Sequence, residues 1–387
     1  CRLAKKLNVP VLLWGPRDEC PDENGMRLRD SQCGLFATGK VLRRFGIPFT
    51  YLKNCNLEDE CFAEGIDRFL RVCNVVKAFR NTRVLQISTR PFDFWSTMCN
   101  EGELLEKFGI QLSPIPMPEL TQAMKDVKEN SPEEIKEVTD YCREKMCIKV
   151  TPEQLDNVAA LKIAMTRLGK KYGCNCGAIQ CWNALQDEIG IMPCAANALC
   201  NDEGFPIACE TDIHGTITSV LVEAAAMGET RSFFADWTVR HPYNDNAELL
   251  QHCGPWPISI AKEKPTIDTP VAFDCSGSLM AQAKDGEHIS LVRFDGDNGE
   301  YSLLLGNAKT VDGPYTKGTY MWVEVENLDR LEDKLVQGPY IHHCVGVHQD
   351  VVPVLYEACK YIGVTPDLYD PIEEKVKAII RGEKVEK

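Results

Sequence analysis

Short apolar runs in this chain alternate with segments of helical periodicity, and this alternation restricts the fold more than any other feature. Val9–Trp14 is apolar and ends in a Gly-Pro pair, as a buried strand entering a loop does. Leu35–Phe45 then carries apolar residues at helical spacing and stops before Gly46, with Pro48 just beyond. Phe49–Leu52 follows as the next strand. A strand, a helix and a strand in this order predict parallel α/β layers.

The alternation continues through the middle of the chain. Thr151 is a suitable N-cap for a helix that has Pro152 at its first position and runs to Leu168 or beyond. The other expected elements are helix Ile66–Phe79, strand Val84–Ile87, helix Glu101–Phe108, strand Leu112–Ile115, a long polar helical region Pro118–Met146, strands Ala178–Trp182 and Ile207–Glu210, and helix Thr216–Met227.

From about Ser232 the pattern changes to shorter β-like runs separated by Gly and Asp turns. His288–Phe294 and Glu300–Leu305 flank the turn sequence 295–299 and predict a hairpin. Gly318–Val325 predicts a further strand. Residues 373–387 form a charged segment that predicts a terminal helix.

The length of 387 residues exceeds what one hydrophobic core usually serves. We predict two Rossmann-like parallel-sheet α/β domains, residues 1–82 and 83–230, followed by a β-rich C-terminal domain with a terminal helix, residues 231–387. The chain begins with Cys1 rather than Met and enters a strand pattern almost at once. We therefore expect that the natural N-terminus is missing and that the first domain is truncated.

The composition excludes several classes of protein. A net charge of −14 weighs against nucleic acid binding, which needs clustered Lys and Arg. The longest apolar runs, such as Thr218–Met227, are too short to span a membrane. The 19 cysteines are odd in number, lie in apolar settings and include no C-x-x-C pair, which argues against a disulfide scaffold and a zinc ribbon. We expect a cytoplasmic protein with reduced thiols and a small-molecule substrate.

Polar residues directly after apolar runs are candidates for a functional site, because ligands of α/β folds gather at the carboxyl ends of strands. Glu210 follows such a run and is either a helix-start anion or a ligand. Asp236 lies between aromatic residues, in a segment too apolar for a casual surface carboxylate, although a turn or cap role is equally open. His342 and His343 lie between apolar residues, and one of them could instead serve the core.

Taken together, two carboxylates and an imidazole suit Mn²⁺ or Mg²⁺ better than structural zinc. A hydroxy-carbonyl substrate binds such an ion through neighbouring oxygens, and the ion polarises the carbonyl. A flanking carboxylate can then move a proton between adjacent carbons. This is the chemistry of aldose–ketose exchange.

Several stretches match one known family in their order and spacing. They are Pro10–Gly15, Phe92–Phe108, Gln180–Trp182, Ala208–Gly215, Phe234–Trp237, His252–Gly254 and His342–His343. Through these stretches the chain resembles the L-fucose isomerase-like proteins, and more distantly the L-arabinose isomerases, over its whole length. The C-terminal β region is shorter than in authentic fucose isomerases, so the sugar is left open.

The resemblance implies a metal site made of Glu210, Asp236 and His343, holding Mn²⁺ or Mg²⁺. It also implies that Glu210 and Asp236 act as acid and base on either side of an enediol. His343 is preferred to His342 because it directly precedes the sequence Cys-Val-Gly-Val.

Four further residues receive a role from the same resemblance. His252 is a fourth metal ligand or a substrate contact. Gln180 and Trp182 lie at a strand end that faces the sugar, although Trp182 could equally belong to the core. Family members form closed homo-oligomers, trimers or hexamers, and Arg17 is the candidate to reach a neighbouring subunit's site; a solvated loop charge is the alternative.

Two other functions compete with the isomerase. A non-catalytic sugar-binding module would use Trp14, Trp182 and Trp237 as sugar platforms, but it would not need the two carboxylates and the histidine. A zinc hydrolase would use the same residue types, but its H-E-x-x-H motif is absent from the sequence. A metal-dependent aldose–ketose isomerase is therefore the predicted function.

Overall fold

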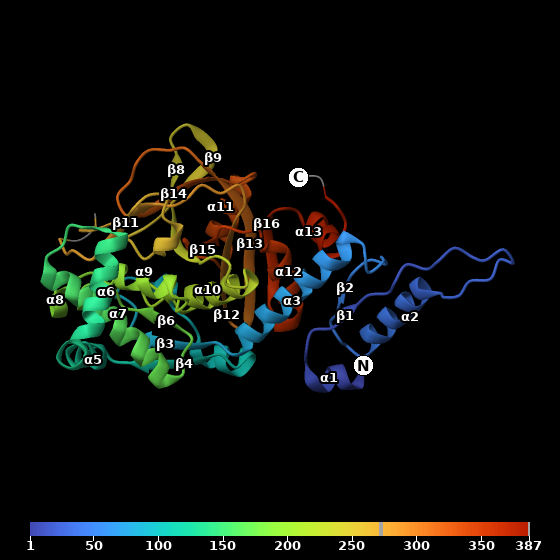
Figure 1. Ribbon diagram of the computed structural model, residues 1–387, viewed down its shortest axis with the longest axis horizontal. Helices are drawn as coiled ribbons and strands as arrows, with labels where there is room; N and C mark the ends of the chain where they lie inside the picture. Colours follow the sequence, from blue (N-terminus) through green and yellow to red (C-terminus); the bar gives the residue numbers. More distant parts are fainter. Residues whose placement is uncertain (271–273, 386–387) are drawn as a thin grey trace.

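The computed structural model describes residues 1–270 and 274–385. Its N-terminal part forms a small lobe at one side of the molecule, and the N-terminus lies in that lobe (Figure 1). Two short parallel strands lie at the centre of this lobe, with Leu12 opposite Thr50 and Leu13 opposite Tyr51. Its elements are α1 (Arg2–Leu7), β1 (Leu12–Leu13), α2 (Ser31–Arg44), β2 (Thr50–Tyr51) and α3 (Glu60–Arg80).

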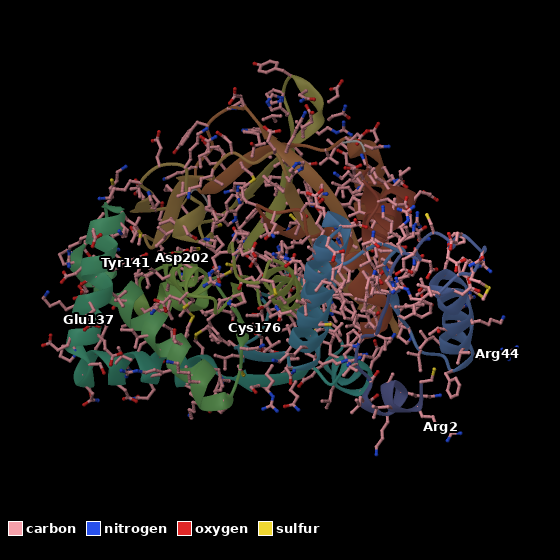
Figure 2. All side chains as sticks on the ribbon, turned by 45° about the vertical axis from the view of Figure 1, so that its right-hand side comes forward. Arg2, Arg44, Glu137, Tyr141, Cys176 and Asp202 are labelled. Carbon is pink, nitrogen blue, oxygen red and sulfur yellow. The ribbon has the colours of Figure 1, made fainter. Side chains whose placement is uncertain are left out.

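The strand expected at Val9–Trp14 is present but much shorter, and among the described strands β1 pairs with β2 alone. Figure 2 shows Arg2 and Arg44 of this lobe at one end of the molecule, with Glu137 and Tyr141 at the opposite end.

A four-stranded parallel sheet forms the centre of the middle region, in the order β4-β3-β6-β7. Its elements are β3 (Arg83–Ile87), η1 (Trp95–Thr97), α4 (Glu101–Glu103), the π-helical η2 (Leu104–Phe108), β4 (Gln111–Ile115), α5 (Met117–Asn130), α6 (Pro132–Lys145), β5 (Cys147–Ile148), α7 (Pro152–Tyr172), β6 (Cys176–Ile179), α8 (Ala184–Ile189), α9 (Cys194–Asp202), β7 (Ile207–Ala208) and α10 (Ile213–Ala225).

Successive residues of the sheet face different layers of helices. Val84 packs in one core with α3 and α10, whereas Leu85 and Ile87 pack in another with α5, α6, α7 and α9. This period of two confirms the expected parallel α/β layering. The polar helical region expected at 118–146 consists of two helices, because Pro132 begins a new helix after Ser131.

Six strands of the C-terminal region close into a barrel, in the order β13-β12-β15-β8-β9-β14 and back to β13. The elements of this region are β8 (Phe233–His241), β9 (Asn244–His252), η3 (Ile258–Ile260), β10 (Thr266–Asp268), β11 (Ser278–Gln282), β12 (Ile289–Asp297), β13 (Glu300–Val311), β14 (Thr319–Glu324), α11 (Leu328–Gln337), β15 (His343–Val347), α12 (Val352–Ile362), β16 (Thr365–Asp370) and α13 (Glu373–Ile380).

The hairpin expected around residues 295–299 is present, but its turn is tighter. β12 continues to Asp297, and only Asn298 and Gly299 connect it to β13, both with positive φ angles of 49° and 80°. Two residues in this conformation match the twist of the strands that they join.

Two helices of the C-terminal region were not expected from the sequence. α11 and α12 lie within the segment that was predicted to be mostly β. α12 packs on α3, and Glu357 of α12 accepts a hydrogen bond from Thr50 of β2 at 2.6 Å. β5, from the middle of the chain, also pairs with β10. The boundaries at 82/83 and 230/231 stay predictions.

α10 lies between the parallel sheet and the barrel, in contact with β6 on one side and with β12 and β15 on the other. This helix brings the end of β7 close to the barrel strands. All 19 cysteines lie in the described part of the chain and carry free thiols. Among the described helices, none has the length and apolar character needed to cross a membrane.

Glu248 of β9 is a buried carboxyl, 8% exposed, and its Oε2 has no hydrogen-bond partner among the described residues. Burial, assisted by the charge of Glu332, raises its pKa to about 7 from an ordinary value of 4.5. Between pH 4.5 and about pH 7, Glu248 of the folded protein keeps a proton that the same residue of the unfolded chain has released. Stability therefore falls as pH rises through this window and stays lower above it.

We predict that Glu248→Gln raises the free energy of unfolding above pH 7 by about 1–3 kcal/mol and changes it little near pH 4.5. Urea unfolding at acidic and at neutral-to-basic pH measures the difference. Glu300→Gln, at an exposed position of β13, is the control and should show no such gain. The same stabilisation at both pH values would contradict the prediction.

Candidate functional site

Glu210 lies just after β7, at the turn that leads into α10. Glu210 and Thr211 both have left-handed backbone, with φ angles of 53° and 52°. Such a conformation costs about 1–3 kcal/mol for each residue with a side chain, and it is found most often at functional sites. Cys181 supports the turn, because its Sγ accepts from the Glu210 N–H and donates to Glu210 Oε1, both at 3.3 Å.

Barrel strands contribute the other members of the cluster. Asp236 of β8 lies directly opposite His343 of β15, and His252 is the last residue of β9. Asp236 is therefore inside a strand, not at a strand end as the sequence suggested, because β8 is a long barrel strand that continues to His241. Of Glu210, Asp236 and His343, only Glu210 lies beyond the carboxyl end of its strand.

Four side-chain atoms converge between α10 and the barrel. His252 Nε2 lies 3.5 Å from Glu210 Oε2 and 3.9 Å from Asp236 Oδ1. His343 Nε2 lies 3.8 Å from Glu210 Oε2 and 3.5 Å from Asp236 Oδ1. We call these four residues the carboxylate–imidazole cluster.

The cluster has the electrostatics of a cation site. Glu210 Oε2 and Asp236 Oδ1 are buried and have no hydrogen-bond partner among the described residues. Burial alone would lower the pKa of His252, but the charges of Asp236 and Glu210 outweigh it and raise this pKa to about 9. Two unpartnered carboxylate oxygens and two imidazole nitrogens fit a borderline divalent ion such as Mn²⁺.

A buried ion-pair network holds His343 in place. Asp212 is the N-cap of α10, and its Oδ2 lies 2.8 Å from His343 Nδ1. An acceptor at this position favours the proton on Nδ1, so that Nε2 is free to act as a ligand. Arg293 of β12 binds both oxygens of Asp212 and also donates to Asp295 at 2.9 Å. Asp295 in turn lies 2.9 Å from His214 Nδ1.

Burial alone would raise the pKa of Asp212. The charge of Arg293 and the hydrogen bond with His343 outweigh this effect and hold the pKa well below its usual range. Asp212 therefore remains a carboxylate.

Three further residues predicted from the sequence, Gln180, Trp182 and His342, differ in their surroundings. Gln180 follows β6 at the same sheet edge as Glu210 and accepts from Ser88 Oγ at 2.7 Å. Trp182 is half-buried, with its ring 5.1 Å from that of Phe94. His342 is exposed, and one of its ring nitrogens comes within 4.8 Å of ligand atoms of Asp236 and His343.

Arg17 is not part of the cluster within this chain. It is exposed in the N-terminal lobe, where its backbone N–H donates to the Cys55 carbonyl at 3.3 Å. Its reach into a neighbouring subunit stays a prediction.

Sequence reasoning missed the residues that support the cluster. Asp212 and His214 belong to the stretch Glu-Thr-Asp-Ile-His, so they were within the motif without a role. Arg293 had one signal, a charge inside the apolar run Leu291–Phe294. Cys181 lies within the matched stretch Gln180–Trp182, but nothing in the sequence gave it a role.

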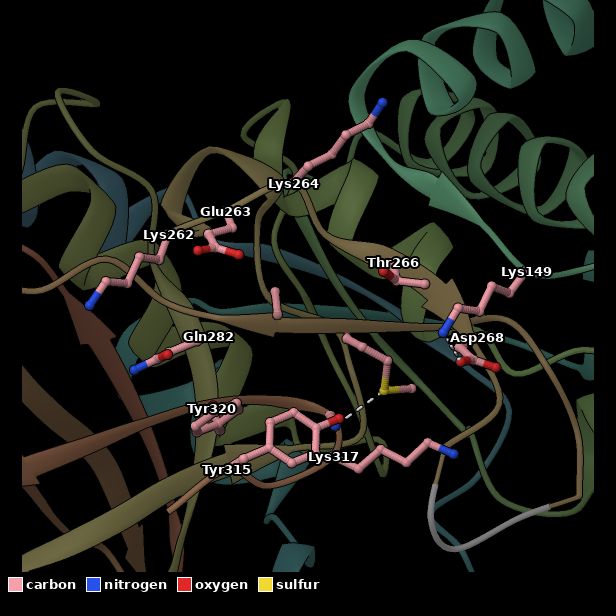
Figure 3. A pocket seen from close by; sticks show the side chains of 13 residues that line it. Lys149, Lys262, Glu263, Lys264, Thr266, Asp268, Gln282, Tyr315, Lys317 and Tyr320 are labelled. Atoms are coloured by element: carbon pink, nitrogen blue, oxygen red, sulfur yellow. Dashed lines mark hydrogen bonds and ion pairs between the residues drawn. The ribbon is translucent and has the colours of Figure 1, made fainter. Parts of the chain in front are cut away.

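A pocket of about 360 Å³ lies elsewhere, against β10, β11 and β14 (Figure 3). Lys149, Lys262, Lys264 and Lys317 are among its lining residues, together with Glu263 and Asp268. Lys149 is ion-paired with Asp268 at 3.3 Å, and Lys262 with Asp285 at 2.7 Å. No member of the carboxylate–imidazole cluster lines this pocket, so its volume is not evidence about the chemistry of the cluster.

We predict that Asp212→Asn lowers the free energy of unfolding by about 3–5 kcal/mol, because it leaves the Arg293 guanidinium buried with less compensating charge. Urea unfolding measures the loss. The matched control is Asp140→Asn on α6, whose ion pairs with Lys136 and Arg143 are exposed to solvent. The control should be unchanged. A similar loss of unfolding free energy in both variants would show that burial of the Asp212–Arg293 pair does not increase its contribution to stability.

Comparison with known proteins finds similarity to sugar isomerases in both a family model and individual relatives. Residues 1–80 match the family model described as "Fucose/sulfoquinovose isomerase, N-terminal domain". The sulfoquinovose isomerases of Priestia aryabhattai and Priestia megaterium are each 25% identical to the chain over 375 residues, which cover 95% of this chain and 82% of the relative. The sulfoquinovose isomerase of Alkalicoccus urumqiensis is 24% identical over 357 residues, covering 91% and 79%.

These likenesses extend over most of the chain. The resemblance found in the sequence is thereby confirmed. The chain is similar to the fucose isomerase-like proteins, and its likeness to the sulfoquinovose isomerases indicates an aldose–ketose isomerase.

Proposed function

We propose that the chain interconverts an aldose and its ketose at the carboxylate–imidazole cluster, by proton transfer through an enediol. The observation that carries this proposal is the pair of buried carboxylate oxygens, Glu210 Oε2 and Asp236 Oδ1, which have no partner among the described residues. Both are held by backbone or strand geometry that does not depend on a substrate. They are therefore available to a cation and to a substrate proton.

Glu210, Asp236 and His343 would hold a Mn²⁺ or Mg²⁺ ion, with His252 as a fourth ligand or a substrate contact. Such an ion, when bound, polarises the sugar carbonyl as a Lewis acid. Asp212 contributes by holding the Nδ1 side of His343, so that Nε2 is directed to Glu210 and Asp236. His343 is favoured over His342 because its ring is buried among the carboxylates, whereas His342 is exposed.

The two carboxylates divide the proton transfers. One removes the proton from the carbon next to the aldose carbonyl, giving the enediol, and returns a proton to the former carbonyl carbon. The other moves the hydroxyl proton between the two neighbouring oxygens. One C–H bond breaks and one forms, so the reaction needs no external oxidant or reductant. Gln180, at the same sheet edge, is placed to hold sugar hydroxyls.

The substrate is a six-carbon aldose without a hydroxyl at carbon six. This proposal rests on the relatives, which are named sulfoquinovose isomerases, and on a family description that names fucose as well. Both sugars share that feature. The free cysteines support a reducing compartment, and we propose the cytoplasm.

The experiment for this function is incubation of the Mn²⁺-loaded protein with sulfoquinovose, L-fucose and other aldoses in deuterium oxide. We predict interconversion of at least one 6-deoxy sugar, with solvent deuterium in the product at the carbon beside the carbonyl. Glu210→Gln and Asp236→Asn should each reduce turnover by at least about 10²–10⁴-fold while the protein remains folded.

Glu300→Gln, which replaces an exposed carboxylate of β13, is the control and should keep full turnover. Product without deuterium would indicate a hydride shift and would remove the proton-transfer roles. Near-normal rates in both amide variants would reject the assignment of the site.

Removal of divalent ions provides a separate prediction. Chelation should abolish turnover, and Mn²⁺ should restore it, with about one ion bound per chain, because the cluster has a single group of converging ligands. His343→Ala should act mainly on ion affinity, so excess Mn²⁺ should rescue part of its activity and should not rescue the amide variants fully. Full turnover with metal analysis confirming an ion-free protein would refute metal dependence.

We also propose a closed homo-oligomer, a trimer or hexamer, in which Arg17 reaches the cluster of a neighbouring subunit. The position of Arg17 on the exposed surface of the N-terminal lobe supports this. We predict that Arg17→Ala lowers turnover without changing the mass measured by analytical ultracentrifugation. A fully active monomer would contradict the proposal.

A further inference from the structure

A second group of metal-ligand side chains lies far from the carboxylate–imidazole cluster in sequence, where the chain leaves β2 and enters α3. Cys55 lies in the connecting loop, Asp59 is the N-cap of α3, and Cys61 is in its first turn. One ligand atom of each residue lies within 4.8 Å of those of the other two. Because all three belong to residues 55–61, the local loop and helix start set their geometry.

Burial raises the pKa of the Cys55 thiol, and a hydrogen bond from Trp14 acts against this effect. Cys55 is only 2% exposed, and the indole N–H of Trp14 donates to its Sγ at 3.3 Å. A hydrogen bond to sulfur stabilises a thiolate, the form in which cysteine binds metal. Cys61 lies in the first turn of the 21-residue helix α3, two residues after Asp59. The Asn56 N–H holds Asp59 Oδ2 at 2.7 Å.

We propose that Cys55, Asp59 and Cys61 bind one divalent cation of the zinc type. Two thiolates and one carboxylate form three corners of a tetrahedron, and water completes it. Binding breaks two S–H bonds, forms two metal–sulfur bonds and releases two protons to solvent, with no change of oxidation state. Thiolate ligands select zinc over Mn²⁺ and Mg²⁺, so this site takes a different ion from the carboxylate–imidazole cluster.

The place of the site in the fold indicates a structural role. The segment after α13 packs on the same loop, where the Lys53 N–H donates to the Arg381 carbonyl at 3.1 Å and Lys384 is ion-paired with Glu60 at 3.1 Å. A Cβ atom at Gly382 would lie 3.3 Å from the Cβ of Cys61. An ion bound here fixes the loop and the start of α3 against the C-terminal segment.

Cobalt titration of the reduced full-length protein tests the site, because Co²⁺ bound to thiolate gives an intense charge-transfer absorption. The wild type should show this absorption at one Co²⁺ per chain, and Zn²⁺ should displace it. Cys55→Ser and Cys61→Ser should each abolish it. Cys33→Ser, an exposed cysteine of the same lobe, and Cys181→Ser, beside Glu210, should both retain it. Undiminished absorption in the Cys55 and Cys61 variants overturns the proposal.

Thiol alkylation of the wild type gives a test that does not depend on the folding of a variant. At a free Zn²⁺ concentration about ten times the dissociation constant, alkylation of Cys61 should slow about tenfold. Alkylation of Cys33 should not change, and peptide mass analysis distinguishes the two. Equal alkylation of Cys61 with and without Zn²⁺ overturns the proposal.

Discussion

The ion pair between Arg293 and Asp212 is the interaction on which the candidate site depends. Asp212 begins α10 and Arg293 lies in β12, so the pair joins the α/β layers to the barrel. Each side chain is 1% exposed, and water cannot compensate either charge. Each ion is therefore tolerated only because the other is present. The same Asp212 carboxylate holds His343, which couples the packing of two layers to the orientation of one imidazole.

The geometry of Glu210 depends on that junction in a second way. β7 ends at Ala208 and α10 begins at Ile213, so the chain must turn within a few residues. It does so with left-handed backbone at Glu210 and Thr211, held by Cys181 Sγ and by the Ile179 carbonyl, which accepts from the Thr211 N–H at 3.0 Å. The turn directs the Glu210 carboxylate to the barrel strands. The strained backbone and the unpartnered carboxylate oxygen therefore belong to the same residue, Glu210. Such departures from the usual rules are common at functional sites.

The parts of the fold that could be predicted are those with a local signal. The alternation of strands and helices in the first 230 residues follows from periodicity, which packing against a sheet requires of neighbouring residues. The barrel could not be predicted, because its closure depends on pairing between β13 and β14 and between β8 and β15, whose residues are distant in sequence. α12 was missed because nine of its 11 residues are buried, so it lacks the broad polar face that identifies a helix.

The sequence by itself determined which residues are chemically able to form the candidate site. Glu210, Asp236 and the His342–His343 pair stand out because carboxylates and imidazoles are rare within apolar segments. Only the tertiary structure decided which of them meet. It set His343 opposite Asp236, placed His252 beside Glu210, joined Asp212 to Arg293 and left Arg17 in the N-terminal lobe. The physical reason is the distance along the chain over which each of these determinants acts. Residue type and periodicity act over a few neighbours, whereas strand register and the contact of a helix with a barrel are set by packing across the whole chain.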